Sequence, residues 1–361
     1  MRRRSFFAGA VALGATSVVG CRLSPTPHLE SPASLEGDAA SYVLAFSNSG
    51  AGDDPSNRQG LALRVSADGA SGDGVTFTPI DNARLLEHNG AAAWLSNEEA
   101  HYWGRRHETW TIPPGGAVDA LVPAGARVLA SINYGTQDSV SYDSALMLFN
   151  DTDHQYSEHD GFLGAGIGWN GELAFGFSAA GLSPDAQLTL LPPATEAGFG
   201  PVTQVSQIWG ERIATLGQYS FALVSRTPGP ESVVDIWRID PAEGSVTPLP
   251  LTGPGADVAQ WYSGNGPAML TGVDNSLYWL ASGSLWVVDP ESGASEEVVK
   301  LSRDSSWFLG VSGVVGVSRA GERWSLVRRS VIDGRIVQEI EGISVPSVPG
   351  LHPFGAVHIS P

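Results

Sequence analysis

The 361-residue chain has very little cysteine, very little lysine and no long apolar stretch. Cys21 is the single cysteine, which excludes an intramolecular disulfide and a cysteine-based metal site. Lys300 is the single lysine and Glu297 stands three positions before it, so the Ser-x-x-Lys motif of one class of hydrolases does not occur. The His-Glu-x-x-His motif is absent, and the nearest match to Gly-x-Ser-x-Gly, Gly310–Val314, lacks its second glycine. These familiar signatures of hydrolases are therefore missing.

Basic side chains are also scarce relative to acidic ones. The formal net charge is −18. Without residues 1–20, which contain three arginines, 17 basic and 38 acidic side chains remain, a net charge of −21. Such a surface repels nucleic-acid phosphates and anionic lipid headgroups. We therefore expect no nucleic-acid partner.

The first 21 residues have the pattern of an export signal. Arginines are followed by an apolar run of about a dozen residues from Ala8 and by small residues before Cys21. A membrane-spanning helix needs roughly 20 apolar residues, so this run is too short to remain as an anchor. The pattern resembles a bacterial lipoprotein signal with its lipobox, which implies cleavage before Cys21 and lipidation of that cysteine by diacylglyceryl and acyl chains such as palmitate.

The arginines of this signal suggest an export route. Arg3, Arg4, Phe6 and Phe7 resemble the twin-arginine consensus, in which two arginines and one further residue precede two apolar residues. The alternative is an ordinary secretion signal with a basic start. Either route predicts a protein held at the cell membrane on its extracytoplasmic face.

The sequence divides into three parts. Residues 1–20 form the expected signal peptide, and residues 21–41 form the lipidated cysteine with a tether rich in Pro and Ser. Residues 42–361 form the expected folded domain, which is large enough to bury a core without a disulfide. We expect a monomer whose first partner is the membrane, through the lipid on Cys21.

The folded domain is predicted to be all-β. From Tyr42 onward, apolar or alternating runs of five to eight residues are separated by Gly, Pro, Asp or Asn. Ile236–Gly244 and Leu285–Gly293 match each other at a spacing of 49 residues, each with an alternating strand, Asp-Pro and a later glycine. Asp and Pro favour the start of a turn, and Gly accepts a positive φ, so each copy predicts a hairpin.

Periods of about 40–50 residues in an all-β chain indicate a β-propeller with four strands per blade. The Asp-Pro-x-x-Gly hairpins resemble those of WD40-like, YVTN-type and quinoprotein-like propellers of bacterial secreted proteins. We predict one propeller of seven four-stranded blades, closed by pairing Tyr42–Phe46 with the final run Phe354–Ile359. Six or eight blades are alternatives, because the segment 151–240 is irregular, and a sandwich or two smaller β domains is another.

Two polar clusters are candidate sites. The first is a set of carboxylates and imidazoles within ten residues that has the ligand types for Zn²⁺ or another divalent metal: Asp151, Asp153, His154, Glu158, His159 and Asp160. Its spacing does not match a calcium loop, and a solvated loop between blades is the alternative. No other cofactor is predicted.

The second cluster is Tyr102, Trp103, Arg105 and Arg106. The arginines offer donors to an anionic ligand, and the aromatic rings offer a stacking wall. A cross-strand ion pair with Glu98, Glu99 or Glu108 is the alternative.

Function is predicted less specifically than fold. The missing motifs favour a non-catalytic binding or scaffold module for a protein, a glycan or a small ligand. A propeller hydrolase or lyase acting on polysaccharide is the first alternative, since such enzymes assemble carboxylates from several blades. An extracytoplasmic metal-binding protein using the loop 150–160 is the second.

Overall fold

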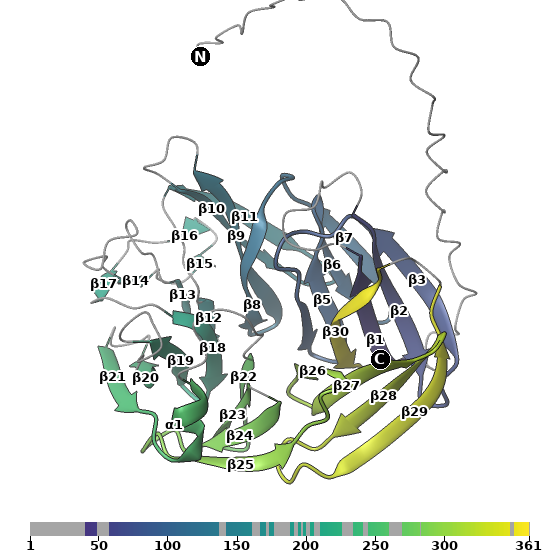
Figure 1. Cartoon of the computed structure of the whole chain (residues 1–361). Helices are drawn as coiled ribbons and strands as arrows, with labels where there is room; N and C mark the ends of the chain where they lie inside the picture. Colours follow the sequence, from purple (N-terminus) through teal and green to yellow (C-terminus); the bar gives the residue numbers. More distant parts are fainter. Residues whose placement is uncertain are drawn as a thin grey trace, which may run out of the picture.

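The computed structural model describes residues 40–48, 58–136, 142–160, 167–170, 173–176, 188–190, 194–195, 198–199, 203–205, 210–225, 234–240, 245–259, 269–281, 283–346 and 350–360. Within these residues the chain is an all-β propeller whose antiparallel sheets follow one another around a ring (Figure 1). The predicted signal peptide, with Arg3, Arg4, Phe6 and Phe7, and the predicted lipidation site, Cys21, lie outside the described residues.

Six four-stranded sheets form the blades, and five of them are meanders with their strands in sequence order. Blade 1 joins the last strand to the first three: β30 (His352–His358), β1 (Ala40–Ser47), β2 (Gly60–Ser66) and β3 (Ser71–Phe77). Blade 2 comprises β4 (Leu85–His88), β5 (Ala91–Leu95), β6 (Glu99–Trp103) and β7 (His107–Thr111). Blade 3 comprises β8 (Ala117–Ala124), β9 (Arg127–Thr136), β10 (Tyr142–Phe149) and β11 (His154–Asp160).

The other three blades come from the second half of the chain. Blade 4 comprises β18 (Gly210–Leu216), β19 (Tyr219–Ser225), β20 (Val234–Asp240) and β21 (Ser245–Pro250). Blade 5 comprises β22 (Met269–Val273), β23 (Ser276–Ala281), β24 (Ser284–Val288) and β25 (Ser295–Lys300). Blade 6 comprises β26 (Ser306–Leu309), β27 (Val314–Ala320), β28 (Arg323–Arg329) and β29 (Ile336–Ser344).

The ring is closed by the two ends of the described chain. β30 pairs antiparallel with β1, with Val43 opposite Val357 and Leu44 opposite Ala356, and Figure 1 shows the yellow final strand beside the purple first one. The predicted pairing of the first and last strands is therefore present. It gives β1 a partner on both sides, so that the edge of β1 is not left to pair with another chain, and β30 becomes the innermost strand of blade 1.

The prediction of seven four-stranded blades was wrong, because the described residues form six. Between β11 and β18 they form only three two-stranded sheets: β12 (Ile167–Asn170) with β13 (Leu173–Gly176), β14 (Leu188–Leu190) with β17 (Thr203–Val205), and β15 (Ala194–Thr195) with β16 (Gly198–Phe199). This stretch contains Pro184, Pro192, Pro193 and Pro201, and proline removes the backbone donor that a strand ladder needs. β12 lies against β8 and β18 and so fills the place between blades 3 and 4.

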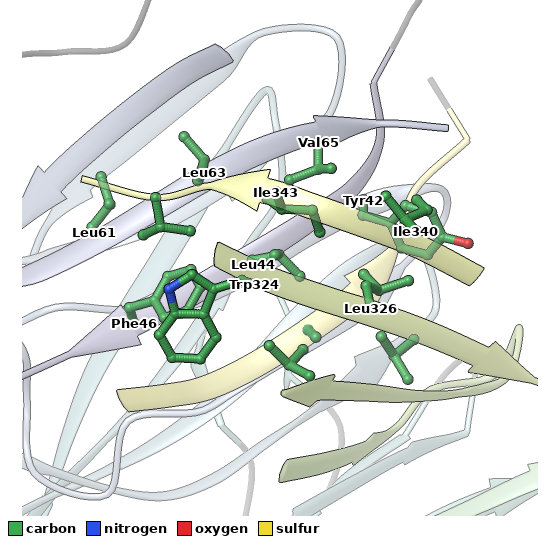
Figure 2. Close-up of a cluster of buried hydrophobic side chains, with 14 of the residues drawn as sticks. Tyr42, Leu44, Phe46, Leu61, Leu63, Val65, Trp324, Leu326, Ile340 and Ile343 are labelled. Atoms are coloured by element: carbon green, nitrogen blue, oxygen red, sulfur yellow. The ribbon is translucent and has the colours of Figure 1, made fainter. Parts of the chain in front are cut away.

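Apolar side chains fill the spaces between neighbouring blades. Figure 2 shows the cluster between blades 1 and 6, where Leu44 and Phe46 of β1 meet Trp324 of β28 and Ile343 of β29. Phe46 and Trp324 pack edge to face with ring centroids 4.9 Å apart. Trp94 and Trp279 are fully buried in other interblade cores. A buried aromatic side chain removes a large apolar area from water, so these contacts hold the blades together.

The two repeated motifs form the same element in adjacent blades, as predicted. They are the outer hairpins β20–β21 of blade 4 and β24–β25 of blade 5. In the second, Asp289 Oδ1 accepts hydrogen bonds from the backbone N–H of Glu291 at 2.7 Å and of Ser292 at 3.1 Å, and Gly293 has φ of 73°. An ion pair of 2.7 Å between Arg238 and Glu291 joins the two copies.

The single helix among the described residues, α1 (Pro254–Ala259), covers β25, where the Gly255 N–H donates to Ser295 Oγ at 3.0 Å. Neither α1 nor any other described segment is a helix of the length and apolarity that crossing a membrane requires.

Candidate ligand-binding site

Polar side chains from blades 1, 2 and 6 meet where the ring closes. Glu87 is near the end of β4, and Ser312 is in the turn between β26 and β27. The Ser312 hydroxyl donates to Glu87 Oε2 at 2.8 Å, and the Ser312 backbone N–H donates to the same oxygen at 3.3 Å. These bonds link blade 6 to blade 2, with blade 1 and its inner strand β30 between them in the ring. The two residues are 225 positions apart in the sequence. They place a carboxylate at the inner ends of strands from different blades.

Glycine on both sides of Ser312 makes this approach possible. A methyl group on Gly310 would lie 2.5 Å from Glu87 Oε2. A methyl group on Gly313 would lie 2.7 Å from the Arg329 carbonyl oxygen and 3.2 Å from Arg328 Cγ. The run that failed to match a nucleophile motif is therefore a turn whose glycines let Glu87 and the stem of Arg328 pass close to the backbone.

Burial and charge act on Glu87 in opposite directions. The side chain is only 8% exposed, and loss of hydration raises its pKa, while the bonds from Ser312 and the positive charge of Arg328 lower it. The net effect is a raised pKa, because burial is the larger cause. Arg328 Nε is buried and has no hydrogen-bond partner among the described residues. A buried carboxyl group and an unsatisfied guanidinium nitrogen thus lie close enough for the charge of Arg328 to affect the pKa of Glu87.

Tyr42 and His358 complete the group on the side of blade 1. Their rings pack edge to face with centroids 5.3 Å apart, and the Tyr42 hydroxyl donates to Gln338 Oε1 at 2.5 Å. Burial raises the pKa of Tyr42 and lowers the pKa of His358, and Arg328 lowers both. At neutral pH the tyrosine is therefore protonated. The group offers donors and acceptors of the kind that fix a small polar ligand.

The predicted arginine and aromatic set is divided by the strand geometry. Tyr102 and Trp103 end β6 and are buried, while Arg105 and Arg106 follow in the exposed β6–β7 turn. Because successive side chains of a strand point to opposite faces, Tyr102 packs toward blade 3 and Trp103 toward blade 1. Trp103 is covered by Arg64, whose guanidinium lies 4.9 Å from its ring centroid. The two rings do not form one exposed wall beside the arginines.

The predicted metal set spans the β10–β11 turn and the outermost strand of blade 3. Asp153 pairs with Arg127 at 2.9 Å, and His154 stacks on Trp110 with centroids 4.5 Å apart. Asp151 and Glu158 are exposed, and the side chains of His159 and Asp160 lie outside the described residues. A strand rises about 3.3 Å per residue, which separates His154 from Glu158 by roughly 13 Å along β11. Among the described residues no three His, Cys, Asp or Glu side chains gather as metal ligands, and the metal site stays a prediction.

Two further histidines, His101 of β6 and His107 of β7, pack together in the outer half of blade 2. The His101 and His107 rings are parallel within 6°, their facing nitrogens lie 3.1 Å apart, and His101 stacks on Trp94 with centroids 4.5 Å apart. His101 Nε2 contacts Ser96 Oγ at 3.0 Å. Burial and the neighbouring His107 lower the pKa of His101 to about 3, and burial and Arg64 lower the pKa of His107 to about 4. Both imidazoles are neutral at physiological pH.

Sequence reasoning missed Glu87, Ser312 and Arg328 as a group, because no motif links positions in two separate blades. The available signal was local. Gly310 and Gly313 flank a serine at the end of an inner strand, and such spacing indicates a close approach to a backbone turn. It does not reveal which distant side chain approaches.

No family model matches the sequence, and no curated protein is significantly similar to it. An acylaminoacyl peptidase in complex with Z-Gly-Gly-Phe-chloromethyl ketone superposes with a TM-score of 0.50 at 10% identity, over 86% of this chain and 51% of that chain. The periplasmic gluconolactonase of Pseudomonas aeruginosa gives 0.46 at 12% identity, over 89% of this chain and 99% of that chain. TolB from Acinetobacter baumannii gives 0.43 at 16% identity, over 82% and 79%. At these identities the likeness is one of fold alone.

Proposed function

We propose that this chain is an exported, lipid-anchored β-propeller that binds a small polar anion, such as a sugar acid, between Glu87 and Arg328 without transforming it. The observation that carries this proposal is the buried Arg328 Nε, a donor without a partner among the described residues, beside the buried carboxylate of Glu87. A ligand carboxylate satisfies the arginine, and a ligand hydroxyl donates to the glutamate. Leaving a buried donor unpaired costs about 1–3 kcal/mol, and a ligand that pairs it recovers part of that free energy.

The place of action in this proposal comes from the N-terminal sequence. The lipobox-like run ending at Cys21 supports acylation and retention at the extracytoplasmic face of the membrane. A single acyl chain gives only marginal membrane binding, so stable anchoring requires the several chains of a bacterial lipoprotein. The protein acts as a monomer, and the ligand is free in solution or is the end of a glycan.

Isothermal titration of the detergent-solubilised full chain with a panel of uronic and aldonic acids tests the binding site. We expect the Arg328→Gln variant to lose at least tenfold in affinity, while the double variant Arg105→Gln, Arg106→Gln binds as the wild type does. Neutral sugars of the same stereochemistry serve as ligand controls. Binding that depends on Arg105 and Arg106 but not on Arg328 would move the site to the β6–β7 turn and contradict the proposal.

A hydrolase or lyase is the second candidate, and one observation favours it. A carboxyl group whose pKa is raised by burial is the form of a general acid, and Glu87 has this property at the inner end of a strand. Glycoside hydrolysis also uses a second carboxyl group, whereas the described partners of Glu87 are Ser312 and Arg328. Chromatography of the titrated mixtures separates the two functions. Product formation that is lost in Glu87→Gln would replace binding by catalysis.

A further inference from the structure

The exposed large apolar side chains of the described residues all belong to blade 6. They are Val311 at 45% exposure, Ile332 at 57%, Ile336 at 50% and Val337 at 47%. We call these four residues the apolar rim. Single exposed apolar residues are common on protein surfaces, but the concentration of all of them on one blade out of six indicates a contact surface.

Strand topology places the four residues at the same end of the blade. Val311 lies in the β26–β27 turn, Ile332 lies in the β28–β29 turn, and Ile336 and Val337 begin β29. In an antiparallel meander, the first and third turns lie at one end and the second turn lies at the other. The β27–β28 turn, at positions 321–322, is therefore at the opposite end and provides a matched reference within the blade.

The first described strand, β1, begins beside β29, the strand that carries Ile336 and Val337. β1 begins at Ala40, and Tyr42 faces His358 at the end of β30, so the start of β1 corresponds to the first-turn end of blade 1. The Tyr42 hydroxyl donates to Gln338, the residue after Val337. The chain that carries Cys21 therefore joins the ring at Ala40, two residues before Tyr42. The Tyr42 side chain contacts β29, which begins with Ile336 and Val337.

Charge distinguishes blade 6 from the rest of the chain. Residues 306–344 contain five arginines and four carboxylates, whereas each of the other five blades carries more acidic than basic side chains. Arg329 ends β28 and Arg335 precedes Ile336, so both arginines are at the rim end, together with Asp333, which lies 3.4 Å from Arg335. Arginines around exposed Ile and Val side chains match a surface that is anionic outside and apolar beneath, which is the chemistry of a lipid headgroup layer.

We propose that the apolar rim and its arginines contact the surface of the lipid bilayer to which the chain is anchored. The proposal rests on the proposed function in one respect, the lipid on Cys21. The acyl chains hold the protein at the membrane, which gives the apolar rim a high local concentration of lipid. A rim that binds lipid too weakly by itself can then set the orientation of the propeller on the membrane. The propeller is then oriented with blade 6 in contact with the headgroups, because the apolar rim lies on this blade alone and does not extend over a whole face of the ring.

Photo-crosslinking tests this orientation. The full-length acylated protein is reconstituted in vesicles of phosphatidylcholine and phosphatidylglycerol that contain a phospholipid with a diazirine near the glycerol end of its acyl chain. After irradiation, mass spectrometry maps the modified peptides. We expect at least tenfold more lipid adducts in peptides containing Val311 and residues 330–337 than in the peptide containing Gly321 and Glu322. The double variant Ile336→Ser, Val337→Ser should reduce the adducts at residues 330–337 severalfold without changing the thermal midpoint.

The possible outcomes separate the two proposals. The mass of the N-terminal peptide first establishes whether Cys21 is acylated. If it is not, the anchor fails, and Cys21 is coupled to a maleimide-bearing lipid so that the rim is tested on the same vesicles. Adducts that are equally frequent at both ends of blade 6 overturn the rim proposal in either case. A dimer in detergent that the serine variant dissociates also overturns it, because the rim would then bind a second copy of the chain.

Discussion

Two neutral histidines, His101 and His107, lie in the outer two strands of blade 2. His101 is 1% exposed and shares a short nitrogen–nitrogen contact with His107, so a proton on either ring would be placed in a poorly hydrated site. The lowered pKa values of about 3 and about 4 express that penalty. The unfolded chain has no such restriction and binds both protons near pH 6.5.

Folding stability should therefore fall as the pH drops below about 6.5, because the unfolded state takes up protons that the native state refuses. Each histidine contributes a slope of about 1.4 kcal/mol per pH unit until its native pKa is reached. The His107→Gln variant should reduce the slope between pH 6 and pH 4.5 by about one proton. Denaturant titrations across this range measure it, and His352→Gln, at an exposed position, is the control. An unchanged slope in His107→Gln would contradict the assignment.

The repeated element is a hairpin whose sequence carries Asp-Pro and a later glycine, and the turn itself is described in the second copy. Both copies could be located from sequence, because Asp, Pro and Gly at fixed spacing leave few alternatives for the backbone. The turn between β24 and β25 has the expected chemistry, since Asp289 accepts two backbone N–H bonds and these bonds lower its pKa. The element that was mispredicted, a further blade within 151–240, lacks this signal and contains several prolines.

Replacing Asp289 by alanine should destabilise the protein by about 1 kcal/mol, because the two N–H groups lose their acceptor. Asp289→Asn keeps an acceptor oxygen at the same place and should lose less than half as much. Chemical denaturation of the two variants at neutral pH provides the comparison. Equal destabilisation by alanine and asparagine would mean that the charge of Asp289, rather than its hydrogen bonds, stabilises the turn.

Closure of the ring is a property of the whole molecule. β30 occupies the inner position of blade 1, and its neighbour Ile359 donates its backbone N–H to the Ser41 carbonyl at 2.9 Å. Without β30, the backbone of β1 has an unpaired edge, and the apolar cluster between blades 1 and 6 loses Ala356. Local strands would remain, but the contact that fixes the first blade to the last would be lost.

Deletion of residues 352–361 should accordingly abolish the single cooperative thermal transition and yield soluble aggregates. Circular dichroism melting and size-exclusion chromatography measure the two effects. Deletion of Pro361 alone leaves β30 complete and should preserve both the transition and the monomer peak. A truncated chain that melts cooperatively as a monomer would show that β1 does not depend on its C-terminal partner.

The sequence by itself determined the fold class, the closure strands and the repeated turns, because these follow from local periodicity and from turn residues acting on their own backbone. Only the tertiary structure decided the blade number, since a blade exists when four strands find partners, and it placed Tyr102 and Trp103 in different cores. It also decided the candidate site and the apolar rim. Glu87, Ser312 and Arg328 meet through ring closure, and the exposure of Ile332 or Ile336 depends on which neighbours cover each face. Those contacts join distant positions, and no local pattern of residues encodes them.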